Sequence, residues 1–468
     1  MTVPTSPRPK APSDALYYLY ALIVGGIVGL IGSVFHILVE RVMEWPAWVI
    51  RAVPGGAAYL VLAAIAAAMV LTSVWMVRRF APEAAGSGVQ EIEGALEGLR
   101  TVHWKRVLPV KFFGGILALG AGLVAGREGP TIHMGASISE AVTRWVALGT
   151  RDGRGLMAAG AAAGLAAAFN APLAAVLFVI EETRRQFPYG FRTYTAVIIG
   201  SAASAVVTEM IGGTAPDLTI AVPDMPLGVL PAFVVLGACL GVLGVVFNAV
   251  LIASLDGALG IGKRWSPYLV PGVVGAVIGI LALLRPEATG GGEQLVLTMT
   301  GENLSVLALA VIVVMRFVMT MASYSTGVPG GIFAPILALA TAAGLLFGGL
   351  LGLIVPLPPG ASVAFAVAAM GGLFSSTVRA PLVGMVLVAE LTGAYGLLLP
   401  VIATCVTANV VAESLKGKPI YEVLLERTLR LSGQTVPPQE SDDAMGGWDE
   451  PERRHPDRLI PDKPKPGA

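Results

Sequence analysis

Apolar runs about as long as a lipid bilayer is thick recur through this chain of 468 residues. Hydrophobic residues make up 55% of the sequence and charged residues only 13%, whereas an ordinary soluble domain carries about 25% charged residues. A helix needs about 20 apolar residues to cross the ~30 Å hydrocarbon core of a membrane. The sequence therefore predicts an all-α, polytopic membrane protein.

Charged and proline-rich stretches divide the chain into five expected parts. These are a cytoplasmic polar tail (1–14), a first membrane half (15–212), a loop (213–226), a second membrane half (227–430) and a disordered cytoplasmic tail (431–468). Arg78 and Arg79 end the second apolar run, and Arg8 and Lys10 lie near the N-terminus. By the positive-inside rule, this pattern predicts an N-terminus on the inner side. The formal net charge is zero, which implies no strong field for nucleic acid.

Part of the first membrane half is repeated in the second. The stretch Ala171–Thr183 resembles Ala380–Thr392, since both begin with Ala-Pro-Leu and end with Glu-x-Thr. Some apolar segments are also shorter than a full span: Leu156–Ala168, Leu173–Ile180, Val363–Phe374 and Leu382–Val388. Two related halves with short, glycine-interrupted segments point to a transporter site where the halves meet. From the residues alone, the halves can be inverted or parallel.

The stretch Gly126-Arg127-Glu128-Gly129-Pro130 places an acid and a base beside glycines inside apolar sequence. Proline suits the first turn of a helix, and glycines leave backbone amides open to approach. The free N–H groups and the dipole at a helix start attract an anion. Glu128 stands where such an anion would bind, so we expect the carboxylate and the anion to compete. Acids inside a membrane are expensive and mark functional sites.

Four stretches together resemble the signature sequences of the CLC chloride channels and proton/chloride exchangers. In chain order they are Gly86–Gly88, Gly126–Pro130, Gly330–Pro335 and Gly417–Tyr421. The resemblance runs from about Tyr17 to Arg430. It implies a homodimer with one pore per subunit, in a bacterial-type inner membrane and in contact with lipid. Each subunit would contain two inverted-repeat halves of tilted, partly discontinuous helices, and would exchange chloride for protons without a cofactor.

The resemblance also assigns roles to single residues. Ser87 and Tyr421 match hydroxyl ligands of the central anion, and Ile332 and Phe333 match residues that donate backbone N–H groups to it. Glu128 matches the external gating and proton glutamate, and Glu182 matches the internal proton glutamate. The supporting motif residues are Gly126, Arg127, Gly129, Pro130, Gly330 and Gly331. Neutral donors suit a chloride ion that has lost its water, because they replace the hydration shell without trapping the ion.

Other functions compete with the exchanger. A passive chloride channel on the same fold is the main alternative, and channels of the family generally lack an acid at the position of Glu182. A fluoride-selective relative is disfavoured by Ser87 and Tyr421. An intramembrane enzyme that uses Glu128 as general acid or base would need a catalytic nucleophile or metal ligands nearby, and the sequence indicates neither. The chain departs from the family at Gln90, where proline is usual.

Some further charged residues have structural interpretations. Glu390 is expected to be structural, whereas its repeat partner Glu181 could share the proton role of Glu182. Lys111 and Arg316 lie within apolar runs. We expect both cations to need acid or carbonyl partners.

Overall fold

The computed structural model describes residues 12–183, 190–213, 218–220, 222–302 and 304–434. Most of the two predicted tails and part of the predicted loop 213–226 therefore lie outside the described residues. Residues as far as Leu425 form one compact unit that contains both membrane halves. The described part of a second unit, from Glu426 onward, is the end of the last helix and the turn after it.

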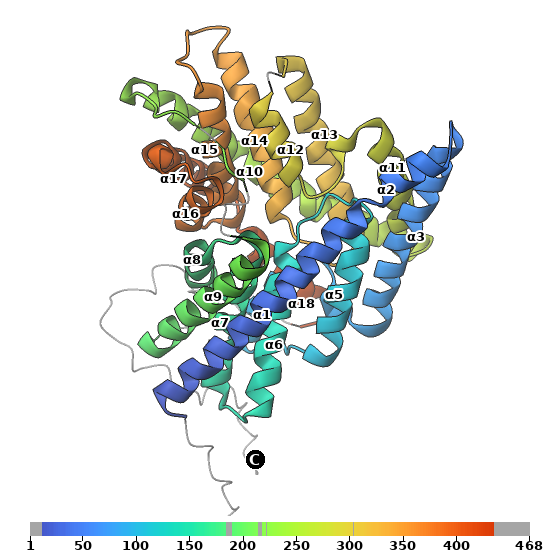
Figure 1. The fold of residues 1–468 in the computed structure, drawn as a ribbon, viewed down its shortest axis with the longest axis vertical. Helices are drawn as coiled ribbons and strands as arrows, with labels where there is room; N and C mark the ends of the chain where they lie inside the picture. Colours follow the sequence, from blue (N-terminus) through green and yellow to red (C-terminus); the bar gives the residue numbers. More distant parts are fainter. Residues whose placement is uncertain (1–11, 184–189, 214–217, 221, 303, 435–468) are drawn as a thin grey trace, which may run out of the picture. The chain divides into compact units, whose positions relative to one another are not determined.

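Within the described residues the regular elements are helices, joined by loops with two isolated β-bridges. The helices are α1 (Asp14–Met43), α2 (Trp45–Ala52), α3 (Ala57–Phe80), η1 (Pro82–Ala84), α4 (Val89–Glu97), α5 (Trp104–Gly120), α6 (Glu128–Trp145), α7 (Thr150–Phe169), α8 (Pro172–Thr183), α9 (Phe191–Gly212), η2 (Leu227–Val229), α10 (Leu230–Arg264), α11 (Leu269–Leu284), η3 (Pro286–Ala288), α12 (Glu293–Gly301), α13 (Val306–Ser325), α14 (Phe333–Leu351), α15 (Ala361–Val378), α16 (Pro381–Thr392), η4 (Tyr395–Leu397), α17 (Leu398–Ser414) and α18 (Ile420–Leu431). Figure 1 shows this arrangement.

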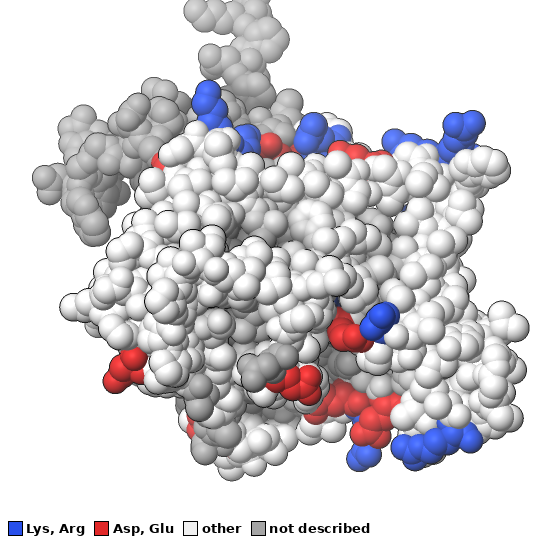
Figure 2. Space-filling model, turned by 90° about the horizontal axis from the view of Figure 1, so that it is seen from above, with Lys and Arg blue, Asp and Glu red and all other residues white. Residues whose placement is uncertain are grey.

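By length and composition, 8 helical segments of the described chain can cross a membrane. They are Asp14–Ala52, Ala57–Phe80, Phe191–Gly212, Leu227–Arg264, Val306–Ser325, Phe333–Leu351, Ala361–Val378 and Tyr395–Ser414. On the face drawn in Figure 2, charged side chains gather toward two opposite edges, and the surface between them is mostly uncharged. The prediction of an all-α polytopic membrane protein is confirmed.

Two of the predicted short segments are longer than expected. Helix α7 has 20 residues and α15 has 18, whereas the apolar runs predicted 156–168 and 363–374. The apolar run that predicted this segment begins only after the charged residues Arg151, Asp152 and Arg154, whereas helix α7 includes them. Helices α8 and α16 are short as predicted, with 12 residues each.

The repeated helices α8 and α16 lie beside each other and run in opposite directions. Glu181 at the end of α8 accepts a hydrogen bond from the first-turn amide of Val383 in α16, at 2.9 Å. In return, Glu390 at the end of α16 accepts one from Ala174 in α8, at 2.7 Å. Because each C-terminal end meets the other's N-terminal end, these repeat copies are inverted.

The structure also reveals a stretch of the repeat that the sequence analysis missed. Residues 82–90 read PEAAGSGVQ and residues 286–294 read PEATGGGEQ. Each copy forms a 3-10 turn, a glycine loop and a short helix, α4 or α12, of 9 residues. The first and third glycines of each loop, Gly86 and Gly88 or Gly290 and Gly292, have positive φ angles, which glycine adopts without strain.

A buried cation holds each of these glycine loops. The Lys111 ammonium donates to the carbonyl oxygens of Gly86 and Ser87 at 2.6 and 2.9 Å. The Arg316 guanidinium donates to those of Thr289, Gly290 and Gly291. Both side chains are fully buried. The carbonyl partners expected for Lys111 and Arg316 are therefore present, and they are equivalent in the two halves.

Candidate functional site

Three glycine-rich loops from both halves are hydrogen-bonded together at the centre of the first unit. The Gly86 amide donates to Val328 O at 2.9 Å, and the Gly330 amide donates to Gly86 O at 3.1 Å. Gly126 and Gly331 exchange two backbone hydrogen bonds, at 2.8 and 2.7 Å. The loops of the predicted motifs therefore meet.

Ser87 lies where these loops meet, and its hydroxyl is buried. The Ser87 amide donates to the Tyr324 hydroxyl at 3.3 Å, so the loop backbone is held while the side chain is not. The Ser87 Oγ atom has no hydrogen-bond partner among the described residues. A Cβ atom at Gly129 would overlap this hydroxyl. Glycine at position 129 thus allows the Ser87 loop to approach the start of α6 this closely.

Glu128 is the first residue of α6 and is fully buried. Its carboxylate folds back over Gly126, where an added Cβ atom would overlap it, and faces Gly331 of the second half. Neither carboxylate oxygen has a hydrogen-bond partner in the described part of the chain. Pro130 lies in the first turn of α6, as its restricted φ angle favours. A buried acid without a partner is costly, so its presence here needs a functional explanation.

Helix α14 begins beside α6. Ile332 is its N-cap residue and Phe333 its first residue, so their amides lie at the N-terminal end of the helix, where donors are free. The Phe333 ring stacks on Phe169, with centroids 6.3 Å apart and an interplanar angle of 7°. It also contacts the Phe374 ring edge-on, with centroids 4.8 Å apart. The side chain of Phe333 is thus core, as its apolar character predicts.

Tyr421 comes from the second half, one residue into α18, and packs with its ring centroid 6.0 Å from that of Phe333. Its phenol is buried and has no hydrogen-bond partner among the described residues. Through its contact with Phe333, Tyr421 lies at the start of α14.

Glu182 lies near the end of α8 and is partly buried. The predicted alternative, a surface ion pair with Arg184 and Arg185, falls outside the described residues. Glu182 interacts with Glu93 of α4. Glu93 is only 1% exposed. No role for Glu93 was predicted from the sequence.

Arg127 precedes Glu128, and it has partners on α7, α1 and α12. Its Nε atom donates to Ala168 O at 3.0 Å, and its Nη1 atom lies 3.0 Å from His36 Nε2. Its Nη2 atom lies 3.6 Å from the carboxylate of Glu293. Arg127 thus has both the carbonyl and the acid partner that a structural role predicts.

The arrangement joins neutral donors with a protonatable acid. Two hydroxyls and the free amides of a helix start can replace water around an anion. No group of three or more His, Cys, Asp or Glu that could hold a metal occurs among the described residues.

Comparison with known proteins gives similarities along nearly the whole chain. Residues 69–413 match the model of a family described as "Voltage gated chloride channel". The H(+)/Cl(-) exchange transporter ClcA of Vibrio parahaemolyticus serotype O3:K6 is 44% identical over 432 residues, which cover 90% of this chain and 91% of that protein. A solved structure of a slow cyanobacterial Cl⁻/H⁺ antiporter matches with a TM-score of 0.84 and 38% identity, over 92% of this chain and 100% of that one. A eukaryotic CLC transporter shares the fold, with a TM-score of 0.75 and 24% identity over 89% of this chain and 75% of that one.

Proposed function

The chain belongs to the voltage gated chloride channel family, the CLC family, and from this premise we propose that it is a secondary active chloride/proton antiporter. The family is one of transporters and channels, and the chain is a multi-pass membrane protein. We further propose that it lies in a bacterial inner membrane as a homodimer with one pore per subunit. Transport, and no enzymatic reaction, is the activity that we assign to it.

One observation supports the proposal: the Glu128 carboxylate and the Ser87 and Tyr421 hydroxyls are all buried, and none of them has a hydrogen-bond partner among the described residues. A carboxylate and a chloride ion carry the same charge and suit the same donors. Ionised Glu128 then occupies the anion path and closes it. Protonated Glu128 leaves the path, and chloride binds to the two hydroxyls and to the amides of Ile332 and Phe333.

The second acid distinguishes exchange from passive conduction. Glu182 interacts with buried Glu93, so a pair of acids from α8 and α4 is available in addition to Glu128. When two carboxyl groups are in contact, the repulsion between their charges makes one of them hold a proton more tightly. We propose that Glu182 passes protons between the inner solution and Glu128, with Glu93 as its immediate neighbour. Chloride crosses by a path that does not need this acid.

The test is flux in liposomes that contain the purified protein and a chloride gradient. The wild-type protein should move protons uphill as chloride runs downhill. Glu182→Gln should abolish proton movement and keep chloride flux, and Glu128→Gln should do the same. If the wild-type protein moves chloride without a coupled proton, the passive channel is the correct function. If neither ion moves, both proposals are wrong.

A further inference from the structure

A cavity of about 790 Å³ opens beside the motif loops, next to the C-terminal end of α1. By the predicted topology this is the outer side, since α1 begins inside. Its charged and titratable lining residues come from α1, from the segment before α6, from η3 and from α12: His36, Glu40, Glu44, Arg127, Glu287 and Glu293. Gly126 and Ala334 also line it, so the cavity leads to the segments that hold Glu128 and Phe333.

The charge of this cavity is unexpected for an anion path. It has one arginine and four carboxylates among its lining residues. A cleft lined by one sign of charge concentrates counter-ions and depletes ions of its own sign. Chloride that approaches from this side therefore depends on Arg127, and on how far Arg127 is neutralised.

Glu293 is placed to neutralise Arg127. Its carboxylate lies 3.6 Å from the guanidinium, with 35% of its side chain exposed. In contrast, Glu287 of the same cavity lies 3.9 Å from Arg285 and is 34% exposed. The two acids thus have equal exposure and different cationic partners.

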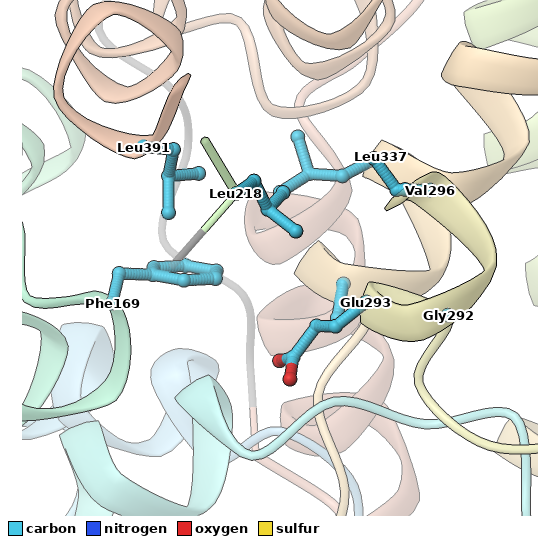
Figure 3. A pocket seen from close by; sticks show the side chains of 8 residues that line it. Phe169, Leu218, Gly292, Glu293, Val296, Leu337 and Leu391 are labelled. Atoms are coloured by element: carbon cyan, nitrogen blue, oxygen red, sulfur yellow. The ribbon is translucent and has the colours of Figure 1, made fainter. Parts of the chain in front are cut away.

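Glu293 also lies at the boundary between the wide cavity and a narrow apolar pocket. Figure 3 shows its carboxylate as the one charged group among Phe169, Leu218, Val296, Leu337 and Leu391, pointing away from Leu218 and Leu337. Phe169 stacks on Phe333. Glu293 thus borders both the narrow pocket and the wide cavity, which Gly126 and Ala334 also line.

We propose that Glu293 is a positioning residue for anion access, whose carboxylate competes with incoming chloride for Arg127. This proposal rests on the antiporter function above. The Glu293 carboxylate neutralises part of the positive charge of Arg127 and repels chloride from the outer mouth of the cavity. When the Glu293 carboxylate swings toward the water of the cavity, Arg127 loses this acidic partner and attracts chloride toward Glu128.

His36 adjoins the same guanidinium, and Glu40 adjoins His36. His36 Nε2 lies 3.0 Å from Arg127 Nη1 and 3.4 Å from the Glu40 carboxylate. A neutral His36 accepts from Arg127, whereas a protonated one donates to Glu40 instead. Glu44 lies 3.7 Å from Arg41. The experiment therefore compares Glu293 with Glu287, and leaves His36, Glu40 and Glu44 unchanged.

The experiment measures initial chloride uptake into proteoliposomes against external chloride concentration at neutral pH. For Glu293→Gln we expect the half-saturating chloride concentration to fall roughly three- to tenfold, the effect of one partly screened charge in a cleft. The maximal rate and the proton-to-chloride ratio should stay as in the wild type.

Two variants serve as controls. Glu293→Asp keeps the charge and should keep the half-saturating chloride concentration near the wild-type value. Glu287→Gln removes the same charge from the same cavity away from Arg127, and should change half-saturation by less than twofold, roughly, at moderate salt. The proposal is wrong if Glu293→Gln leaves half-saturation unchanged, or if Glu287→Gln lowers it equally. A wild-type protein that shows no proton-coupled uptake would overturn the antiporter function itself, which is a separate result.

Discussion

Glu181 and Glu390 cap each other's helices. Glu181 accepts from the Leu382 and Val383 amides at 3.3 and 2.9 Å, and Glu390 accepts from the Leu173 and Ala174 amides at 3.1 and 2.7 Å. Each carboxylate meets free N–H groups and the positive end of a helix dipole. The pair therefore ties the two repeat copies together through one reciprocal contact.

We expect Glu390→Ala to destabilise the protein and to leave transport coupling unchanged. Loss of a charged cap costs about 1–2 kcal/mol, and Glu390 has no direct contact with Ser87, Glu128 or Tyr421 in the structure. Thermal unfolding of the purified protein in detergent measures the first effect, and the proton-to-chloride ratio measures the second. Glu390→Gln keeps one acceptor oxygen, so its stability should lie between that of the wild type and that of Glu390→Ala. A changed ratio in Glu390→Ala would show that Glu390 takes part in transport.

The two buried cations should differ in what they affect. Lys111→Met leaves the carbonyl of Ser87 without its described donor, and we expect a loss of about 1–3 kcal/mol of stability together with weaker chloride binding. Arg316→Met removes donors to Thr289, Gly290 and Gly291. It should destabilise more and leave chloride affinity at the central site nearly unchanged.

Unfolding measurements and chloride titration calorimetry separate these outcomes. Arg316→Lys serves as the control, because it keeps the charge and part of the hydrogen bonding. If Lys111→Met and Arg316→Met change chloride affinity equally, the prediction that only the loop held by Lys111 serves the central anion site is wrong.

Gln90 fixes the loop that carries Ser87. Its Oε1 atom accepts from the Gly88 amide at 3.2 Å, and a Cβ atom at Gly88 would collide with the His133 ring. We expect Gln90→Ala to cost about 1 kcal/mol of stability and to reduce the preference for chloride over nitrate, because the loop beside Ser87 loses a fixed point. Gln90→Pro also lacks the acceptor, and proline is tolerated in a first helical turn, so it should act like Gln90→Ala. Flux ratios for the two anions check this, and a Gln90→Pro variant with wild-type selectivity would refute it.

The sequence was most informative where single residue types constrain the backbone. Gly126, Pro130 and Gly331 marked helix starts, and the structure has helices beginning at Glu128 and Phe333. The all-α membrane fold followed from apolar runs alone. The inverted arrangement of the halves came only with the resemblance to the CLC family and was then seen in the contact of α8 with α16.

Other features depended on tertiary contacts that no local pattern reveals. Helices α7 and α15 extend through charged or polar residues at their ends, so counting apolar residues underestimated them. Glu93 received no role from the sequence, and only the fold places it beside Glu182. The sequence predicted that Lys111 and Arg316 would need acid or carbonyl partners. It could not predict which carbonyl groups they would bind, because that depends on how α5 and α13 pack beside the two glycine loops.

Gly126 limits where the Glu128 carboxylate can lie, which gives the sharpest test of the gate. A Cβ atom at Gly126 would overlap the Glu128 carboxylate, and Gly126 has no positive φ angle. The backbone therefore accepts alanine, and the flexible acid has to move. We expect Gly126→Ala to displace the carboxylate from the anion path, to raise chloride flux severalfold, and to lower the number of protons moved per chloride. Coupled flux in liposomes measures both.

Two comparisons make the test of Gly126→Ala specific. In a Glu128→Ala background, Gly126→Ala should have no further effect on chloride flux, since interacting residues are non-additive. Gly331→Ala would instead meet the backbone nitrogen of Gly129 at 2.8 Å, and a backbone atom cannot swing aside. That variant should lose more stability than Gly126→Ala, because the backbone has to shift as well as the Glu128 carboxylate, which lies 3.2 Å from the added Cβ atom. If Gly126→Ala exchanges chloride and protons as the wild type does, the carboxylate does not close the path from the position seen in the structure.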